Sequence, residues 1–256
     1  MDLSKVSWKN AKEKLTGQPV MLLFGSVEEH GYHLPMDTDT QIMNAIVESL
    51  EQDFKIHHYP AITFGQVWSA KDYEGTVSIN EDVLMMYGEE VVKSMMRAKV
   101  SKVILYSFHN GNLSCLKKIQ RQIKEDGFQE IYILSYPNID KDVSYLLDSS
   151  LPNGIWHAGE LETSLMLYLN EKDVDLTKAV VEDQGANRKQ QLRGDSWRNF
   201  NKSGAFGNPA IATKEKGRKI YEQIICKLKK DLEIILWEFI GHKIKELSVF
   251  KALSEN

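Results

Sequence analysis

Cysteine is scarce in this sequence, and its two copies, Cys115 and Cys226, form no CxxC pair. We therefore expect reduced thiols that serve packing, and no thiolate metal site. Long apolar runs are also missing, because no stretch approaches the roughly 18 apolar residues of a membrane span. The polar N-terminal stretch lacks the apolar core of a signal peptide. These absences predict a soluble, cytoplasmic protein without a membrane partner.

An excess of basic residues is absent too, since the formal net charge is −4. A nucleic-acid partner normally requires a basic face, so we expect none. The short basic cluster at 227–230 is followed by Asp231 and Glu233, which is typical of a solvated helix face. The phosphate-binding patterns GxGxxG and GxxxxGK[ST] do not follow the first predicted strand, which argues against a nucleotide-binding protein.

Apolar runs that fit strands alternate with stretches of helical periodicity. The predicted strands are 19–26, 55–64, 102–108 and 130–136. The predicted helices are 38–52, 79–98, 112–127, 159–170 and 213–240. This alternation predicts the α/β class, with a mainly parallel central sheet covered on both faces. The length suits a single domain over residues 1–256, with 171–212 as a long excursion of unassigned role.

Acidic and imidazole side chains follow several of the predicted strands. Glu28, His30, His33 and Asp39 come after the first strand, and His109 comes directly after the third. The stretch WHAGELETS, residues 156–164, follows the fourth strand and a loop. Ligands of open parallel sheets bind beyond the carboxyl ends of the strands, so the fold can bring these segments together.

A mixed set of histidine and carboxylate ligands suits zinc, manganese or iron(II). Glu28 and His30 are two residues apart and project to one side of extended backbone. Asp39 lies at the predicted start of a helix, with Thr38 or Asp39 as the N-cap, where a carboxylate can bridge two cations. The simpler interpretation is that each of these groups is a loop carboxylate, a helix cap or a hydrogen-bonded histidine.

The motifs, taken together, resemble the creatininase (creatinine amidohydrolase) family. GSVEEHGYHLPMDTD at 25–39 is similar to the family pattern GSxEQHGxHLPxxTD, and HAGELETS at 157–164 matches HAGExETS. HNGN at 109–112, YEGT at 73–76 and GAFGNPAIATKEKG at 204–217 resemble GHGGN, FPGT and GxxGxPxxATxEKG of the family. The matches run in family order over most of the chain.

The resemblance implies a three-layer α/β/α sandwich, two divalent metal ions, amide hydrolysis by a metal-activated water, and a homo-oligomer that is commonly a hexamer. It places metal ligands at Glu28, His30, Asp39, His109 and Glu160, with Asp39 as the bridge. His157 falls on the histidine that shuttles protons. We expect Glu162 to orient His157 or the water, or to cap the helix, and His33 to support a ligand. Trp68, Tyr73 and Trp156 are candidates for pocket walls or for core packing.

Two departures from the family pattern concern the substrate. The true creatinine hydrolases carry a glutamate where this chain has Gly111, and an apolar residue where it has Glu160. Creatinine is therefore a doubtful substrate, and a small cyclic amide or formamide is the expected one. The alternatives are a family peptidase and a non-catalytic metal-containing binding protein. The family glutamine is replaced by Glu29, which we expect to alter the pocket lining.

Overall fold

The computed structural model describes residues 1–135, 142–149, 157–181 and 188–254. Within these residues, four strands form a parallel sheet in the order β2-β1-β3-β4. The strands are β1 (Pro19–Leu23), β2 (His57–His58), β3 (Lys102–Ser107) and β4 (Ile131–Ser135). The α-helices are α1 (Trp8–Leu15), α2 (Thr38–Asp53), α3 (Glu81–Arg97), α4 (Leu113–Glu125), α6 (Glu160–Asn170), α7 (Arg188–Arg193) and α8 (Lys214–Ser254).

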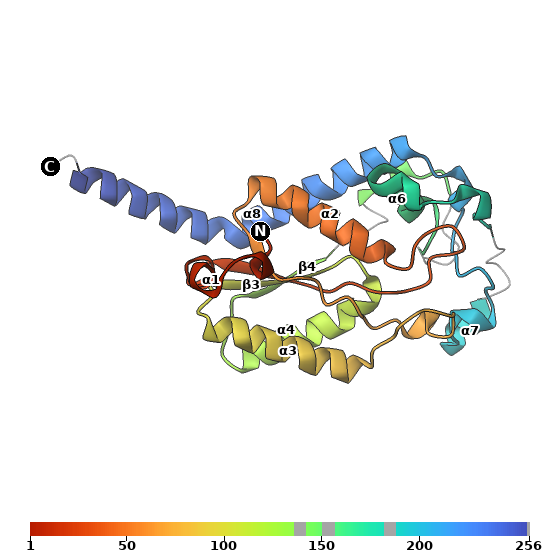
Figure 1. Ribbon diagram of the computed structural model, residues 1–256, viewed down its shortest axis with the longest axis horizontal. Helices are drawn as coiled ribbons and strands as arrows, with labels where there is room; N and C mark the ends of the chain where they lie inside the picture. The colour runs from red at the N-terminus through yellow and green to blue at the C-terminus, as the bar shows by residue number, and fades with distance from the viewer. Residues whose placement is uncertain (136–141, 150–156, 182–187, 255–256) are drawn as a thin grey trace.

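The sheet lies between two layers of helices, which confirms the predicted three-layer α/β/α fold (Figure 1). Helices α2, α6 and α8 cover one face, and α3 and α4 cover the other. Side chains of β1 alternate between the two layers: Met21 and Leu23 pack with the first group, and Val20 and Leu22 with the second. Because both faces are buried, β1 and β3 are continuous apolar runs without the alternation of a half-exposed strand.

The predicted strand 55–64 is mostly wrong, since only His57–His58 pairs with β1. Pro60 has no backbone N–H to donate to a ladder, so regular pairing stops before it. The chain nevertheless stays beside β1, where Phe24 and Ile62 form an isolated parallel bridge. His57 and His58 thus form the edge strand of the sheet.

The strand order places a topological switch point, where open α/β sheets form their ligand crevice, beyond the ends of β1 and β3. Helix α2, which follows β1, lies on one face of the sheet, whereas α4, which follows β3, lies on the other. Such a reversal of strand order is the point where open α/β sheets bind ligands. The loop after β1 and the residues after β3 both follow the carboxyl ends of strands at this switch point.

Among the described residues, no helix combines the length and the hydropathy that crossing a membrane would require. Both cysteines are free, with Cys115 buried and Cys226 exposed. The single-domain organisation stays a prediction.

Candidate metal centre

The first group of ligand-type atoms joins the loop after β1, the start of α2 and the end of β3. It consists of Glu28, Asp39 and His109. Nδ1 of His109 lies 2.9 Å from Oδ2 of Asp39 and 3.0 Å from Oε2 of Glu28. All three side chains are less than 9 % exposed. The crevice at the switch point thus holds two carboxylates and an imidazole within the reach of one ion.

A second group shares Asp39 and adds residues from the loop after β1 and from α6. Nε2 of His30 lies 3.5 Å from Oδ1 of Asp39 and 3.8 Å from Oε2 of Glu162. The two oxygens of Asp39 therefore face different groups: Oδ2 faces His109, and Oδ1 faces His30. Asp37, and not Thr38 or Asp39, is the N-cap of α2, which leaves the Asp39 carboxylate available to the crevice.

Backbone carbonyls fix the two imidazole rings. Nδ1 of His30 donates to the carbonyl of Glu28 at 3.0 Å, which leaves Nε2 facing the second group. Nε2 of His109 donates to the carbonyl of Gln66 at 2.9 Å, which leaves Nδ1 facing the first group. Metal-binding histidines are commonly oriented in this way through the other ring nitrogen. Oε2 of Glu28 and Nε2 of His30 are buried without a hydrogen-bond partner among the described residues, so the site fits a cation that would satisfy them.

The charges around the crevice are strongly coupled. Burial alone would lower the pKa of His30, but Asp39 and Glu162 outweigh it and raise this pKa to about 9. For His109, burial is outweighed by Glu28 and Asp39, and its pKa lies well above the usual value. The pKa of Asp39 is well below its usual range, because His30 and His109 outweigh its burial. Buried carboxylates thus require positive charge here, which protons or bound cations can supply.

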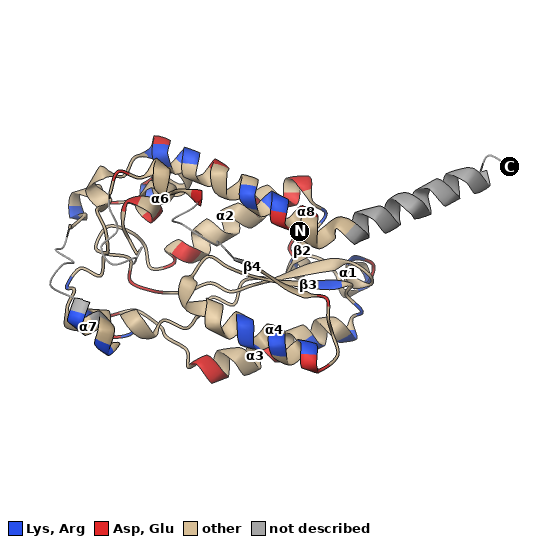
Figure 2. Cartoon of the chain, turned by 180° about the vertical axis from the view of Figure 1, so that it is seen from behind, with Lys and Arg blue, Asp and Glu red and all other residues tan. Residues whose placement is uncertain are grey.

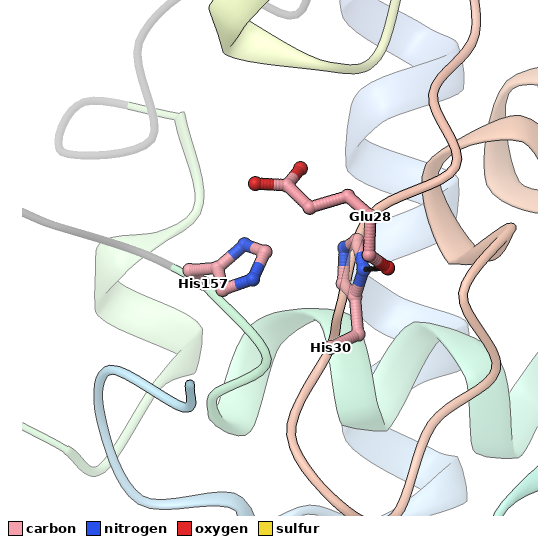
Figure 3. Close-up of side chains that lie close together, drawn as sticks. All are labelled: Glu28, His30 and His157. Atoms are coloured by element: carbon pink, nitrogen blue, oxygen red, sulfur yellow. Dashed lines mark hydrogen bonds between the residues drawn. The ribbon is translucent and has the colours of Figure 1, made fainter. Parts of the chain in front are cut away.

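His157 completes the crevice from the segment that leads into α6. One ligand-type atom from each of Glu28, His30 and His157 lies within 4.8 Å of the others, and their side chains converge from two segments (Figure 3). Nε2 of His157 donates to the carbonyl of Glu29 at 2.7 Å and lies 3.1 Å from its carboxylate oxygen Oε1. Burial alone would lower the pKa of His157, but Glu28 and Glu29 raise it well above the usual value.

Glu160, which the resemblance placed among the metal ligands, lies outside the three ligand-type groups of the described residues. Its carboxylate pairs with Lys216 and accepts from Ser149, through the hydroxyl at 2.6 Å and the backbone N–H at 2.8 Å. The N–H of Asp148 donates to it as well. The carboxylate is fully buried and already neutralised. Glu162, which we expected to orient other groups, occupies the second ligand group instead.

Gly111 stands where creatinine hydrolases carry a glutamate, and its lack of a side chain has a local reason. A Cβ at this position would collide with the His109 ring and would lie 2.5 Å from the carbonyl oxygen of Gln66. These are the two partners that hold the ring in its present orientation. The glycine therefore allows His109 to direct Nδ1 toward Glu28 and Asp39.

The remaining predicted residues fall around the crevice. Nε2 of His33 lies 2.8 Å from the hydroxyl of Thr163, in the same turn of α6 as Glu162. Tyr73 is buried and donates to the carbonyl of Asn201, whereas Trp68 is 46 % exposed. Trp156 lies outside the described residues.

Sequence reasoning missed two neighbours of His157. Glu29 contacts it directly, although it was expected to line the pocket only. The ring of Trp197, from the excursion 171–212, lies 5.0 Å from the His157 ring. The substitution of glutamine by glutamate was a signal for Glu29, whereas no pattern marked Trp197.

Acidic residues at the start of α2 and along α6 lie at the same end of the molecule (Figure 2).

This chain is similar in sequence to a known protein family. A family model described as creatininase, creatinine amidohydrolase, matches residues 4–232. The chain belongs to the creatininase family. The match includes both ligand groups, His157 and Lys216.

Curated relatives of this family member have two different names. The mycofactocin precursor peptide peptidase of Mycolicibacterium smegmatis is 26 % identical over 218 residues, which is 80 % of this chain and 81 % of that protein. The creatinine amidohydrolase of Pseudomonas putida is 24 % identical over 196 residues, which is 70 % of this chain and 75 % of that protein.

Solved creatininase structures share the fold. A structure named creatininase Mn has a TM-score of 0.77 at 21 % identity, covering 91 % of this chain and 98 % of its own. A mutant creatininase described as the Zn-Zn type has a TM-score of 0.74 at 20 % identity, with the same coverage. At these identities the similarity shows the fold alone, and the chain is a creatininase-family hydrolase by its family match.

Proposed function

We propose that this creatininase-family hydrolase cleaves a C–N amide bond with two divalent cations. The observation that carries the proposal is the pair of ligand groups that share Asp39. One group would hold a cation with Glu28, Asp39 and His109, and the other with His30, Asp39 and Glu162. Glu162 thus takes the place that the sequence assigned to Glu160.

The donors are imidazole nitrogens and carboxylate oxygens, which suit zinc, manganese or iron(II). The Mn and Zn-Zn descriptions of two solved relatives support the first two metals. Bound cations would supply Lewis-acid chemistry, polarising the amide carbonyl and favouring hydroxide over water near neutral pH.

His157 is the candidate proton carrier. Hydrolysis forms a C–O bond from water and breaks the C–N bond, and the leaving nitrogen must take up a proton as it departs. His157 lies beside both Glu28 and His30 but remains outside the two shared ligand groups, so it is available for this transfer. Its hydrogen bond to the Glu29 carbonyl holds the ring in place.

A small non-peptide amide, such as a cyclic amide or formamide, is our first candidate substrate. The six residues of the two ligand groups and the proton carrier are each 1–8 % exposed, and this burial favours a small molecule over an extended chain. These are Glu28, His30, Asp39, His109, His157 and Glu162. A peptide is the second candidate, because the relatives at 26 % identity are named peptide peptidases.

The test is an activity screen of metal-reconstituted protein against creatinine, formamidopyrimidines, small lactams and short peptides. We expect wild-type protein to turn over a small amide and to hold two bound ions by elemental analysis. We expect Asp39→Asn to lose both the activity and the two-ion content. The matched control is Asp37→Asn, two residues away and exposed, which should keep both.

A wild-type protein without a transition metal, or an Asp39→Asn variant that keeps two ions and full activity, would refute the site. Two bound ions without hydrolysis of any compound would favour the binding-protein alternative. Turnover of peptides alone would favour the peptidase.

A further inference from the structure

The imidazole of His157 is packed between two other rings. The centroid of His30 lies 4.4 Å away at an interplanar angle of 44°, and that of Trp197 lies 5.0 Å away at 52°. His30 belongs to the second ligand group, whereas Trp197 comes from residues 171–212, the excursion of unassigned role. His157 is only 5 % exposed as a result of this packing.

Trp197 is itself held on a short 3-10 helix, Trp197–Asn199. Its ring lies 4.7 Å from that of Phe206, and it packs against a small buried cluster that includes Val67 and Tyr73. The N–H of Phe206 donates to the carbonyl of His157 at 2.7 Å, so the frame of the indole is tied to the backbone that carries the imidazole. Contacts with Phe206 and with the cluster that includes Val67 and Tyr73 therefore hold the indole in place beside His157.

A hydrogen bond alone does not define the plane of a histidine ring. The bond from Nε2 to the Glu29 carbonyl fixes one ring atom, whereas the terminal torsion of histidine is broad and has no sharp staggered wells. The tilted contact with the Trp197 ring restricts this torsion. Since proton transfer depends on the direction of the donating nitrogen, an aromatic face at position 197 acts on the reaction through His157.

We propose that Trp197 is a positioning residue, which holds the ring plane of His157 for proton transfer to the leaving nitrogen. This inference rests on the proposed amide hydrolysis. Trp197 requires no contact with the substrate for this role. An aromatic replacement should therefore preserve it, and an aliphatic one should not.

The test compares Trp197→Leu with Trp197→Phe in the metal-reconstituted protein. We expect Trp197→Leu to lower kcat by roughly 10- to 100-fold, the effect of a small displacement of a catalytic group, with KM within about 3-fold of wild type and metal content unchanged. Trp197→Phe should stay within about 3-fold of wild type in kcat. The matched control is Phe200→Leu, because Phe200 lies on the same loop and meets Phe206 edge-on at 6.2 Å.

A second measurement does not depend on turnover. Diethyl pyrocarbonate labels exposed imidazoles, and mass spectrometry of peptides resolves the label on His157. We expect labelling of His157 to rise several-fold in Trp197→Leu, and to remain at the wild-type level in Trp197→Phe and Phe200→Leu.

The inference is overturned if Trp197→Leu has the wild-type kcat, or if Phe200→Leu loses as much kcat as Trp197→Leu. It is also overturned if Trp197→Phe does not retain a kcat near that of wild type. If wild-type protein hydrolyses nothing in the panel, the proposed function fails by itself. In that case unchanged labelling in Trp197→Leu overturns the packing role, and increased labelling supports it.

Discussion

Glu160 and Glu162 lie in the same turn of α6, and their carboxylates have opposite environments. Both are buried, at 0 % and 8 % exposure. Glu160 is neutralised by Lys216 and accepts from two backbone N–H groups and a hydroxyl. Glu162 accepts from the N–H of Ala158 at 2.6 Å and otherwise faces His30 and Asp39. The comparison teaches that burial alone does not distinguish a candidate ligand from a structural carboxylate, whereas the contacts that each carboxylate makes differ clearly.

The strongest test of this comparison is the same substitution at both positions. We expect Glu162→Gln to lose one of two ions and to reduce activity by roughly 1,000-fold or more, equivalent to about 4 kcal/mol of activation free energy. Glu160→Gln should keep two ions under the same loading. Elemental analysis and steady-state rates measure both. Loss of an ion from Glu160→Gln, with none from Glu162→Gln, would reverse the assignment.

The Glu160 contact should matter for folding instead. Glu160→Gln removes the buried carboxylate that faces Lys216 and leaves this lysine with its contact to the largely exposed Asp148. The free energy of unfolding should therefore fall by about 1–3 kcal/mol. Urea unfolding measures this effect. The double variant Glu160→Gln, Lys216→Met should recover part of the loss, because no partly buried ammonium remains beside the neutral amide. A loss below about 1 kcal/mol in the single variant would contradict the structural role.

Two histidines of the loop after β1 extend the comparison. Burial and the positive charge of His30 lower the pKa of His33 to about 4, whereas that of His30 rises to about 9. Unfolded chains bind a proton at His33 near pH 6.5, so this residue favours the folded state above that pH. Its contribution is lost as the pH falls from about 6.5 to about 4, and it amounts to at most about 3 kcal/mol.

The measurement is urea unfolding of the metal-free protein across this pH range, for wild type and His33→Gln. The difference in the free energy of unfolding between wild type and His33→Gln should become smaller or change sign as the pH falls. A constant difference from pH 7 to pH 4 would show that His33 does not titrate in this window.

The smallest effect is expected at the far part of α8, the helix that carries Lys216 near its start. Trp237 is 76 % exposed, so Trp237→Ala should change the free energy of unfolding by no more than about 0.5 kcal/mol. Light scattering on the same samples tests the predicted homo-oligomer, which requires a mass that is a multiple of 29.3 kDa. A large loss of stability on substitution would place Trp237 in a contact between copies.

Much of the crevice could be predicted, because parallel strands deliver their ends to one edge. Glu28, His30, Asp39 and His109 follow directly from that rule and the strand order. The assignment of Glu160 as a ligand stays a prediction, although the structure places Glu162 and not Glu160 among the ligand-type groups of the described residues. Residues two apart on a helix point in nearly opposite directions, so a one-dimensional motif does not reveal which of two glutamates faces the crevice.

Other features depend on contacts that no local pattern encodes. Trp197 lies forty residues beyond His157 in a segment without apolar periodicity, and long-range contacts, among them the pairing of Phe206 with His157, bring it close. The short β2 reflects Pro60, which has no N–H for the ladder, although the sequence predicted a strand over 55–64. Long-range packing, which sequence periodicity does not report, decides these features.

The collision that a side chain at Gly111 would produce has an evolutionary consequence. On this backbone a glutamate at position 111 and the present His109 orientation are mutually exclusive. Introducing a carboxylate at position 111 therefore requires a coupled change, such as a shift of the chain around Gln66.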